Sequence, residues 1–319
     1  MTLVVAIKCT GGLVLAADSR GTGYRFDPEA PESDRTVFDD KSRKLFSFRA
    51  PFDNIGVLSY DHHGVSAGFG RDEQEVAAQI QRHSIDRCIR LFKQEIYKTH
   101  PKKRITVNEF WVRFYRFLVK YWQHYREQRC DIVYKMNQYI QESASKHAET
   151  VPPITLEVKL LVTGFNQGEK AGHVLPILLT DDEKDWEGEQ YRGTIAPVEM
   201  IPHPCGVFCG GVKDFVIPVL TADDPVESIR KLQRSSTETI VAEIVAMKAR
   251  FDIRCVLVPP QSGFSFFASD DMPADDAQRL ALLLIRGTRD FFGGKGTVGG
   301  AIRICTLNPL SGTKCCNRS

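Results

Sequence analysis

Short apolar runs rich in β-branched residues open the chain, and polar segments separate them. The first two runs are joined by Cys9-Thr10-Gly11-Gly12, whose glycines predict a tight turn and therefore a hairpin. A polar, proline-containing stretch from Phe26 to Asp40 precedes the next two runs. The pattern thus predicts four strands within the first 60 residues, at about 3–9, 13–18, 44–48 and 54–58.

Apolar residues then recur at helical spacing between Asp72 and Lys98, which predicts an amphipathic helix. A second helix is expected to begin at Thr106, because Thr106 and Glu109 have the spacing of a capping box. This helix carries a stripe of aromatic residues and is expected to continue to about Ser145. Such a stripe suits a ligand groove or a helix that faces the core, and its spacing favours the core.

The second half of the chain alternates short apolar runs with helical patterns. Asp224-Pro225 supplies an N-cap and a first-turn proline for a helix that reaches about Arg250. A further helix is expected at about 275–291. Strands are expected at about 155–163, 174–180, 194–201, 206–210, 253–258, 264–268 and 301–307.

The order of these elements predicts a single α+β domain over residues 1–319, with helices packed over sheets. Within this domain the pattern predicts two additional elements. One is a long helical hairpin at about 72–147, and the other is a helix followed by a strand at about 224–258.

Composition narrows the possible partners. The 319 residues are 42% hydrophobic, and their formal net charge of +2 is far below that of proteins which bind nucleic acid by electrostatics. The sequence contains no run of about 18 apolar residues, so no membrane-spanning helix is predicted. The apolar start is not expected to be a signal peptide, because Lys8 interrupts it and Gly11-Gly12 divides it.

The nine cysteines and the glycine-rich segment indicate neither a metal nor a cofactor. The cysteines contain no CxxC pair and have no histidines at zinc-binding spacing, so most are expected to be buried, reduced thiols of a cytoplasmic protein. The adjacent Cys315 and Cys316 are expected in an exposed tail. The segment Gly293–Gly300 follows a helix and precedes a strand, the reverse of a phosphate-binding loop, so no nucleotide is expected there.

Candidate chemistry lies at the start of the chain. A threonine hydroxyl needs a base before it can attack a carbonyl group, and a free α-amino group, with a pKa of about 7.7 to 8.0, can supply one. Thr2 follows Met1, and threonine is small enough for methionine aminopeptidase to expose it. Removal of Met1 would therefore place a nucleophile and a base on one residue.

The opening stretch TLVVAIKCTGGLVLAADSRGT resembles the N-terminus of proteasome β-subunits and HslV, which are N-terminal-nucleophile hydrolases. In that family an N-terminal threonine begins a hairpin that ends in Ala-Asp-Ser/Lys-Arg-x-Thr. Thr2, Asp18, Arg20 and Thr22 occupy the matching positions. The stretch DDKSRKLF is similar to the second family signature, which places Lys44 at the catalytic lysine.

The resemblance implies a four-layer αββα sandwich and assigns roles to individual residues. Thr2 would be the nucleophile, and Lys44, paired with Asp18, would favour the alkoxide and keep the α-amine deprotonated by like-charge repulsion. The backbone N–H of Ser59 would hold the oxyanion. Asp290, in a stretch similar to the family's Arg-Asp-x-x-Ser-Gly-Gly, would orient the nucleophile and the amine, although the serine of that motif is not in place.

The resemblance further implies a peptide or protein substrate and a homo-oligomer, and it is compatible with an ATP-dependent unfoldase as partner. Two alternatives stay open at this stage. The chain could be similar to connectase, which transfers peptides through an acyl-threonine intermediate. It could also be a non-catalytic structural subunit of a proteasome-like assembly, because serines of the family pattern are missing.

Overall fold

The computed structural model describes most of the chain, and everything below refers to those residues. They are 3–24, 36–40, 42–60, 85–124, 134, 137–138, 141, 157–180, 199–211, 214–222, 238–256, 264–268, 271–293 and 298–318. Predictions that fall elsewhere lie outside the described residues: the first part of the helix at 72–98, the end of the helix expected to reach Ser145, most of the strand at 194–201, and the start of the helix at Asp224.

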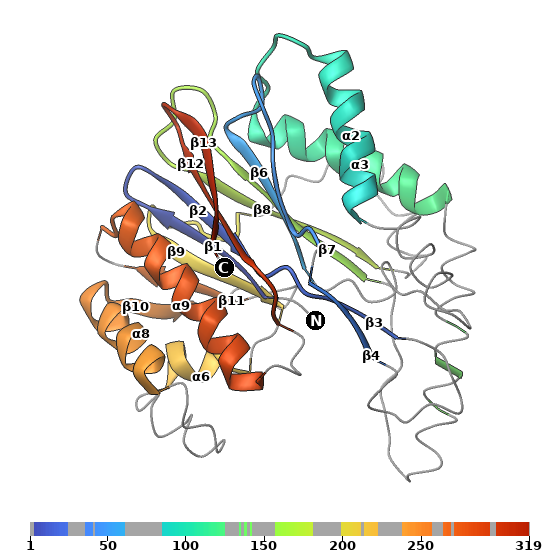
Figure 1. Ribbon diagram of the computed structural model, residues 1–319. Coiled ribbons are helices and arrows are strands. Elements are labelled where there is room, and N and C mark those ends of the chain that lie inside the picture. The colour runs from blue at the N-terminus through green and yellow to red at the C-terminus, as the bar shows by residue number, and fades with distance from the viewer. Residues whose placement is uncertain are drawn as a thin grey trace.

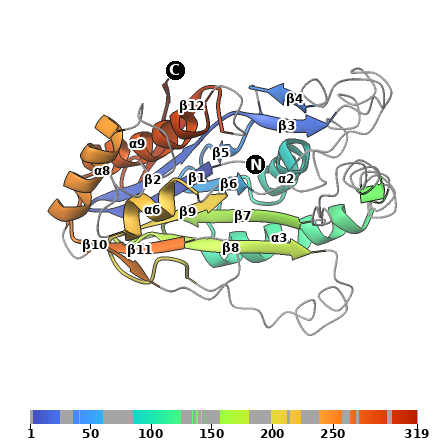
Figure 2. The same cartoon turned by 90° about the horizontal axis from the view of Figure 1, so that it is seen from below.

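Two antiparallel sheets form the centre of the molecule (Figures 1 and 2). The larger sheet has the strand order β10-β11-β9-β1-β2-β12-β13, and the smaller has the order β5-β6-β7-β8. Strands β3 (Gly21–Tyr24) and β4 (Thr36–Asp39) form a separate two-stranded ribbon. The strands of the larger sheet are β1 (Leu3–Cys9), β2 (Gly12–Ala17), β9 (Gly206–Gly211), β10 (Ile253–Val256), β11 (Phe264–Ala268), β12 (Ile302–Asn308) and β13 (Gly312–Arg318). Those of the smaller sheet are β5 (Leu45–Ser47), β6 (Ile55–Tyr60), β7 (Glu157–Gly164) and β8 (His173–Thr180).

The hairpin β1–β2 lies in the middle of the larger sheet and is buried on both faces. Side chains alternate across a strand, so Leu3, Val5 and Ile7 join one apolar cluster while Val4 and Ala6 join another. The first cluster includes residues of the helices, and the second includes residues of both sheets. Burial on both faces explains why these strands are continuously apolar and not alternating.

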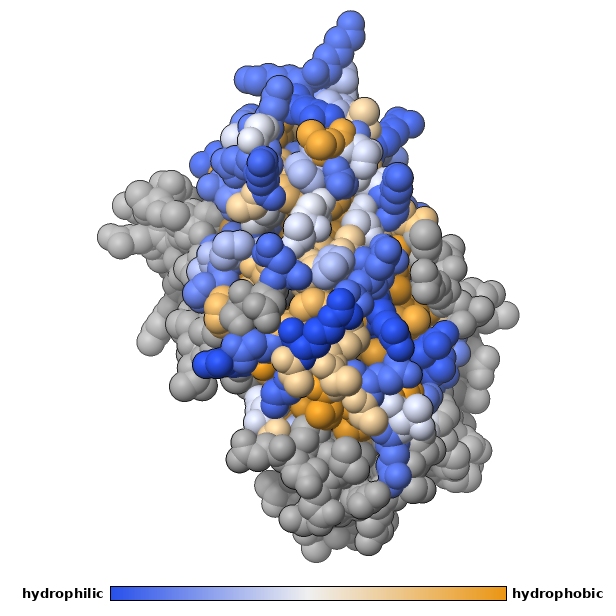
Figure 3. Space-filling view, turned by 90° about the vertical axis from the view of Figure 1, so that its left-hand side faces the viewer, coloured by the Kyte–Doolittle hydropathy of each residue, from blue (hydrophilic) through white to orange (hydrophobic). Residues whose placement is uncertain are grey.

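Helices cover the outer face of each sheet. Helices α6 (Val216–Thr221), α8 (Glu238–Arg250) and α9 (Ala274–Phe292) pack on the larger sheet, and α2 (Ile85–Thr99) and α3 (Val107–His124) pack on the smaller one (Figure 1). On the side that faces the viewer in Figure 3, hydrophobic side chains reach the surface between charged ones. The result is a mixed α/β fold with antiparallel sheets and helices, which confirms the predicted class at that level.

The predicted elements agree with the structure where both can be compared, but four elements of the structure were not predicted. Most of the aromatic stripe of α3 faces the core, as its spacing favours. Thr106 Oγ1 accepts from the N–H of Glu109 at 3.0 Å, so half of the capping box forms, while the Glu109 carboxylate pairs with Arg113. The unpredicted elements are the short helix α6 and the strands β3, β4 and β13.

The cysteines differ in part from the prediction of reduced thiols. Cys9, Cys88, Cys205 and Cys209 are buried and form no disulfide, as expected. Cys315 lies in β13 and not in a tail, and it forms a disulfide with its register partner Cys305 in β12. Within the described ranges, no helix is long and apolar enough to cross a membrane.

Candidate active site

Asp18 is the centre of a buried polar cluster at the end of β2. Its side chain is 1% exposed, and its two carboxylate oxygens accept three backbone N–H groups. The donors are Leu3 to Oδ1 at 3.0 Å, and Arg20 and Gly299 to Oδ2 at 3.0 and 3.3 Å. A buried carboxylate is stable only when its charge and lone pairs find partners, and here both requirements are met.

Lys44 supplies the charge that balances Asp18. Its Nζ lies 2.9 Å from each carboxylate oxygen and also donates to the carbonyl of Arg20, so three acceptors surround a group that is 4% exposed. Burial lowers the pKa of Lys44 from its ordinary value, and the neighbouring Asp18 charge opposes that shift. We call Asp18, Lys44, Gly299 and the amide of Leu3 the Asp18 cluster.

The chain folds this way because hairpin geometry joins distant residues. The register of β1 with β2 pairs Val4 with Ala17, so the first residue of β1 lies beside the residue that follows β2. Lys44 immediately precedes β5 of the other sheet. The two sheets therefore meet at the start of the chain, and the ion pair between Lys44 and Asp18 links them.

Hydrogen bonds to Asp40 hold the loop that follows Asp18. The guanidinium of Arg20 forms two bonds with Asp40, from Nε at 2.6 Å and from Nη2 at 3.0 Å, and Ser19 Oγ donates to the Asp40 carbonyl at 2.6 Å. The hydrogen bond from Arg20 holds the pKa of Asp40 below its ordinary value. The loop position of Arg20 is thus fixed from both its backbone and its side chain.

The glycine-rich segment after α9 takes part in the cluster. The carbonyl of Gly299 accepts from Ser19, and its N–H donates to Asp18. A Cβ on Gly299 would lie 2.4 Å from the Arg20 guanidinium carbon, and one on Gly300, at φ +70°, would lie 2.4 Å from Ser19 Oγ. Only glycine allows this approach. The sequence did not predict this contact of Gly299, because nothing local indicates a partner 281 residues away.

Ser59, the predicted oxyanion donor, lies within the smaller sheet. Its backbone N–H donates to the Lys44 carbonyl at 2.8 Å, which extends the pairing of Leu45 with Leu58 between β5 and β6. The sequence predicted that the fourth strand ends near residue 58, whereas β6 continues to Tyr60. The N–H of Ser59 is therefore used within the sheet in this structure, and its oxyanion role stays a prediction.

The structure does not bring Asp290 into the cluster. Asp290 lies in the last turn of α9, where its side chain is 38% exposed and accepts from Arg289 Nε at 3.3 Å. Within the described part of the chain, no contact joins it to Asp18 or Lys44. Thr2 itself lies outside the described residues, so its predicted role stays a prediction.

The glycines Gly210 and Gly211 lie within β9, beside the start of β1. Val4 pairs with Gly210 and Leu3 with Gly211. A Cβ on Gly210 would lie 2.7 Å from the ring of Tyr60, so this glycine lets the ring pack against the strand. The described residues contain no group of three or more His, Cys, Asp or Glu side chains suited to a metal ion.

Comparison with known proteins found similarity to solved structures. No family model matches the sequence, and no curated protein matches it. The fold is similar to that of a Gly-1 mutant of Anbu from Hyphomicrobium sp. strain MC1, with a TM-score of 0.41 and 12% identity over 100% of this chain and 88% of that chain. A similarity of this size leaves the function to be argued from the geometry of the Asp18 cluster.

Proposed function

We propose that this chain is a threonine-type N-terminal-nucleophile hydrolase that acts on peptide or amide bonds through Thr2. The Leu3 amide carries the proposal. It belongs to the peptide bond that follows Thr2, and it donates directly to the carboxylate that holds Lys44. Consecutive Cα atoms lie about 3.8 Å apart, so the buried ion pair and the proposed nucleophile are near neighbours through covalent geometry alone.

Removal of Met1 would give Thr2 the free α-amine that the reaction needs. The Thr2 hydroxyl oxygen attacks the carbonyl carbon while its proton passes to the amine. The tetrahedral intermediate collapses, the leaving amine takes that proton, and an acyl ester remains on Thr2. Water then hydrolyses the ester and regenerates the hydroxyl. The positive charge of Lys44 favours the deprotonated amine by like-charge repulsion and stabilises the developing negative charge.

The proposed oxyanion donor is the backbone N–H of Ser59, which would have to exchange its bond with the Lys44 carbonyl for one with the substrate. The role of Asp290 in orienting the amine stays a prediction. The αββα sandwich of the resembled family, its peptide substrates, a homo-oligomer, an unfoldase partner and a cytoplasmic location belong to the same proposal.

A second candidate is a structural subunit without catalysis. Two observations favour it: the N–H of Ser59 is occupied, and Asp290 is partly exposed and lies away from Asp18. Under this reading the ion pair of Lys44 with Asp18 only joins the two sheets at the chain start. The two candidates differ in what they require of residue 2, because only the catalytic one needs a free α-amine there.

Intact mass and N-terminal sequencing of the purified protein test the proposal, before and after a covalent peptide inhibitor that needs both the hydroxyl and the free amine of threonine. We expect loss of Met1 and one adduct on Thr2, which the Thr2→Ala variant does not form. Retained Met1, or removal of Met1 without an adduct, favours the structural subunit. Adding a peptide with a free amine to the acylated enzyme separates hydrolysis from connectase-like transfer by the product formed.

A further inference from the structure

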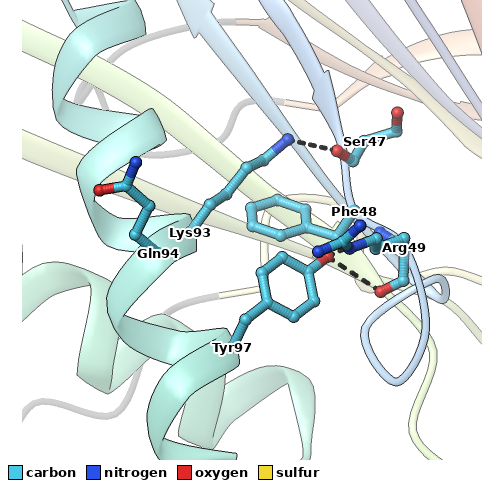
Figure 4. A pocket seen from close by; sticks show the side chains of 6 residues that line it. All are labelled: Ser47, Phe48, Arg49, Lys93, Gln94 and Tyr97. Atoms are coloured by element: carbon cyan, nitrogen blue, oxygen red, sulfur yellow. Dashed lines mark hydrogen bonds between the residues drawn. The ribbon is translucent and has the colours of Figure 1, made fainter. Parts of the chain in front are cut away.

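A groove of about 630 Å³ lies between the end of β5 and helix α2, separate from the Asp18 cluster (Figure 4). Its volume is within the range of small-molecule sites. It lies on the outer face of the smaller sheet, where α2 packs. Its lining comes from the chain at the end of β5 and from α2, namely Ser47, Phe48, Arg49, Lys93, Gln94 and Tyr97.

Two cations lie over aromatic rings in this groove. Lys93 Nζ donates to the carbonyl of Ser47 at 2.5 Å and lies 4.5 Å from the ring centre of Phe48. The guanidinium of Arg49 lies 5.2 Å from the ring centre of Tyr97. In Figure 4 both side chains extend between α2 and the chain after β5, and the ring of Phe48 is seen between their charged groups. The aromatic faces hold the cations in place but leave their charge without an anion.

The described part of the chain supplies no carboxylate to either cation. Asp86, the acidic residue that acts on Lys93, forms its ion pair with Arg90 at 3.0 Å. Asp53, which acts weakly on Tyr97, is paired with Arg104 at 3.2 Å. The groove therefore carries an excess of positive charge.

The pKa of Lys93 is lowered in this groove. Burial, and after it repulsion by Arg43, lower the pKa to about 8, with Asp86 opposing the shift as the smallest contribution. The negative charge of a bound anion would also oppose the shift and would raise this pKa.

The backbone that carries Arg49 is fixed to α2. The Tyr97 hydroxyl accepts from the N–H of Arg49 at 2.7 Å and donates to its carbonyl at 3.0 Å. These two bonds tie the chain after β5 to the helix that carries Lys93. A site whose charged groups are held in advance loses less conformational freedom when a ligand binds.

We propose that this groove binds a phosphate monoester, with the phosphate between Lys93 and Arg49 and the organic remainder along the apolar walls. A phosphate monoester carries a charge of about −1.5 to −2 and three acceptor oxygens. It can therefore balance the two cations of this groove, whereas a carboxylate carries only a single negative charge. Arginine binds such a group through two parallel N–H bonds, and lysine binds it as a point charge. The ester can belong to a small molecule or to a phosphorylated side chain.

Calorimetric titration with phenyl phosphate tests the site in the full-length protein. We expect Lys93→Gln and Arg49→Gln each to weaken binding about tenfold or more, because each removes a charge-assisted hydrogen bond. Lys98→Gln is the matched control, since Lys98 lies in the last turn of the same helix and is exposed. It should change binding less than twofold. Equal losses in Lys93→Gln and Lys98→Gln, or no binding by the wild type, would overturn the proposal.

Two further measurements define the ligand. The pKa of Lys93, followed by NMR of its ε-carbon, should rise on addition of phenyl phosphate and stay unchanged with benzyl alcohol. Tighter binding of phenyl phosphate than of a phosphotyrosine peptide assigns the site to small esters, and the reverse order assigns it to phosphorylated side chains. Succinate binding as tightly as phenyl phosphate would overturn the preference for phosphate. None of these measurements depends on Thr2, so their outcome is independent of the proposed catalysis.

Discussion

Two buried lysines lie toward opposite ends of β1, and they are alike in most respects. Lys44, which reaches the Leu3 end through Asp18, is 4% exposed, and Lys8, near the other end, is 5% exposed. Burial lowers the pKa of both, and in both a carboxylate opposes the shift. Residue type, depth and direction of the pKa shift therefore do not distinguish them.

Their partners do distinguish them. Asp18 is buried and collects three backbone N–H groups, one of them at the start of the chain. The partner of Lys8 is Glu199, at 3.0 Å, whose side chain is 25% exposed and also faces His173. One lysine thus belongs to a closed ion pair beside the amide that follows Thr2, and the other to an open network in which a partly exposed carboxylate also faces His173. A perturbed pKa alone does not identify a catalytic group.

The largest difference is expected when each lysine is replaced by methionine. Lys44→Met leaves the Asp18 charge buried without its partner, and we expect a loss of about 3–5 kcal/mol in the free energy of unfolding. Lys8→Met leaves a carboxylate whose side chain is 25% exposed and which still faces His173, so we expect a smaller loss of about 1–2 kcal/mol. Urea denaturation of the two variants measures both values. Equal losses would remove the distinction between a closed and an open pair.

The double variant Asp18→Asn, Lys44→Met controls for the volume of the lysine. It removes both charges together, so it should recover much of the stability lost by Lys44→Met alone. Without such recovery, the loss would come from packing and not from an unpaired charge.

An intermediate effect is expected at the glycine contact of the Asp18 cluster. Gly300 and Gly168 both have positive φ, at +70° and +84°, but only Gly300 has neighbours where a Cβ would lie. We expect Gly300→Ala to cost about 2–3 kcal/mol and Gly168→Ala about 1 kcal/mol, because both pay for the backbone conformation and only the first creates a clash. Thermal unfolding in parallel gives the difference. Similar losses would show that the loop at Ser19 yields without cost.

The smallest effect is a pH dependence that belongs to the open network alone. Hydrogen bonds to Glu199, and then to Glu169, raise the pKa of His173 above its ordinary 6.5. A raised pKa means that this stabilisation is fully present below about pH 6.5 and is lost as the pH rises through the folded-state value. The stability difference between wild type and His173→Gln should therefore be larger at pH 5.5 than at pH 9. A difference that does not change with pH would contradict the assignment.

The sequence predicted the hairpin because it depends on a strong local pattern, whereas the pairing of Asp18 with Lys44 was predicted only through the resemblance to N-terminal-nucleophile hydrolases. Continuous apolar runs around Gly11-Gly12 define β1 and β2, and the motif residues lie at their ends. The strand β13 escaped prediction because its residues, GTKCCNR, are mostly polar and pair with only one neighbour at the edge of the sheet. Helix α6 was missed because it has six residues and contains Pro218.

The features of the site that the sequence did not predict have a common physical cause. They depend on contacts between segments that are far apart in the sequence. The register of β5 with β6 determines which acceptor the Ser59 N–H contacts, and a run of apolar residues does not specify that register. The contact of Gly299 with Asp18 depends on how the turn after α9 packs on the hairpin. Local sequence therefore found the charged pair but not the backbone groups around it.

The central claim is that the Asp18 cluster serves Thr2, and the rate of covalent labelling at Thr2 tests it most directly. Intact mass should show labelling of wild type and Lys8→Met at rates within about threefold. The folded double variant Asp18→Asn, Lys44→Met should be labelled at least about 100-fold more slowly, since a cation aligned with developing negative charge accounts for factors of this size. Equal labelling of the double variant and wild type, or an adduct that persists in Thr2→Ala, would contradict the account.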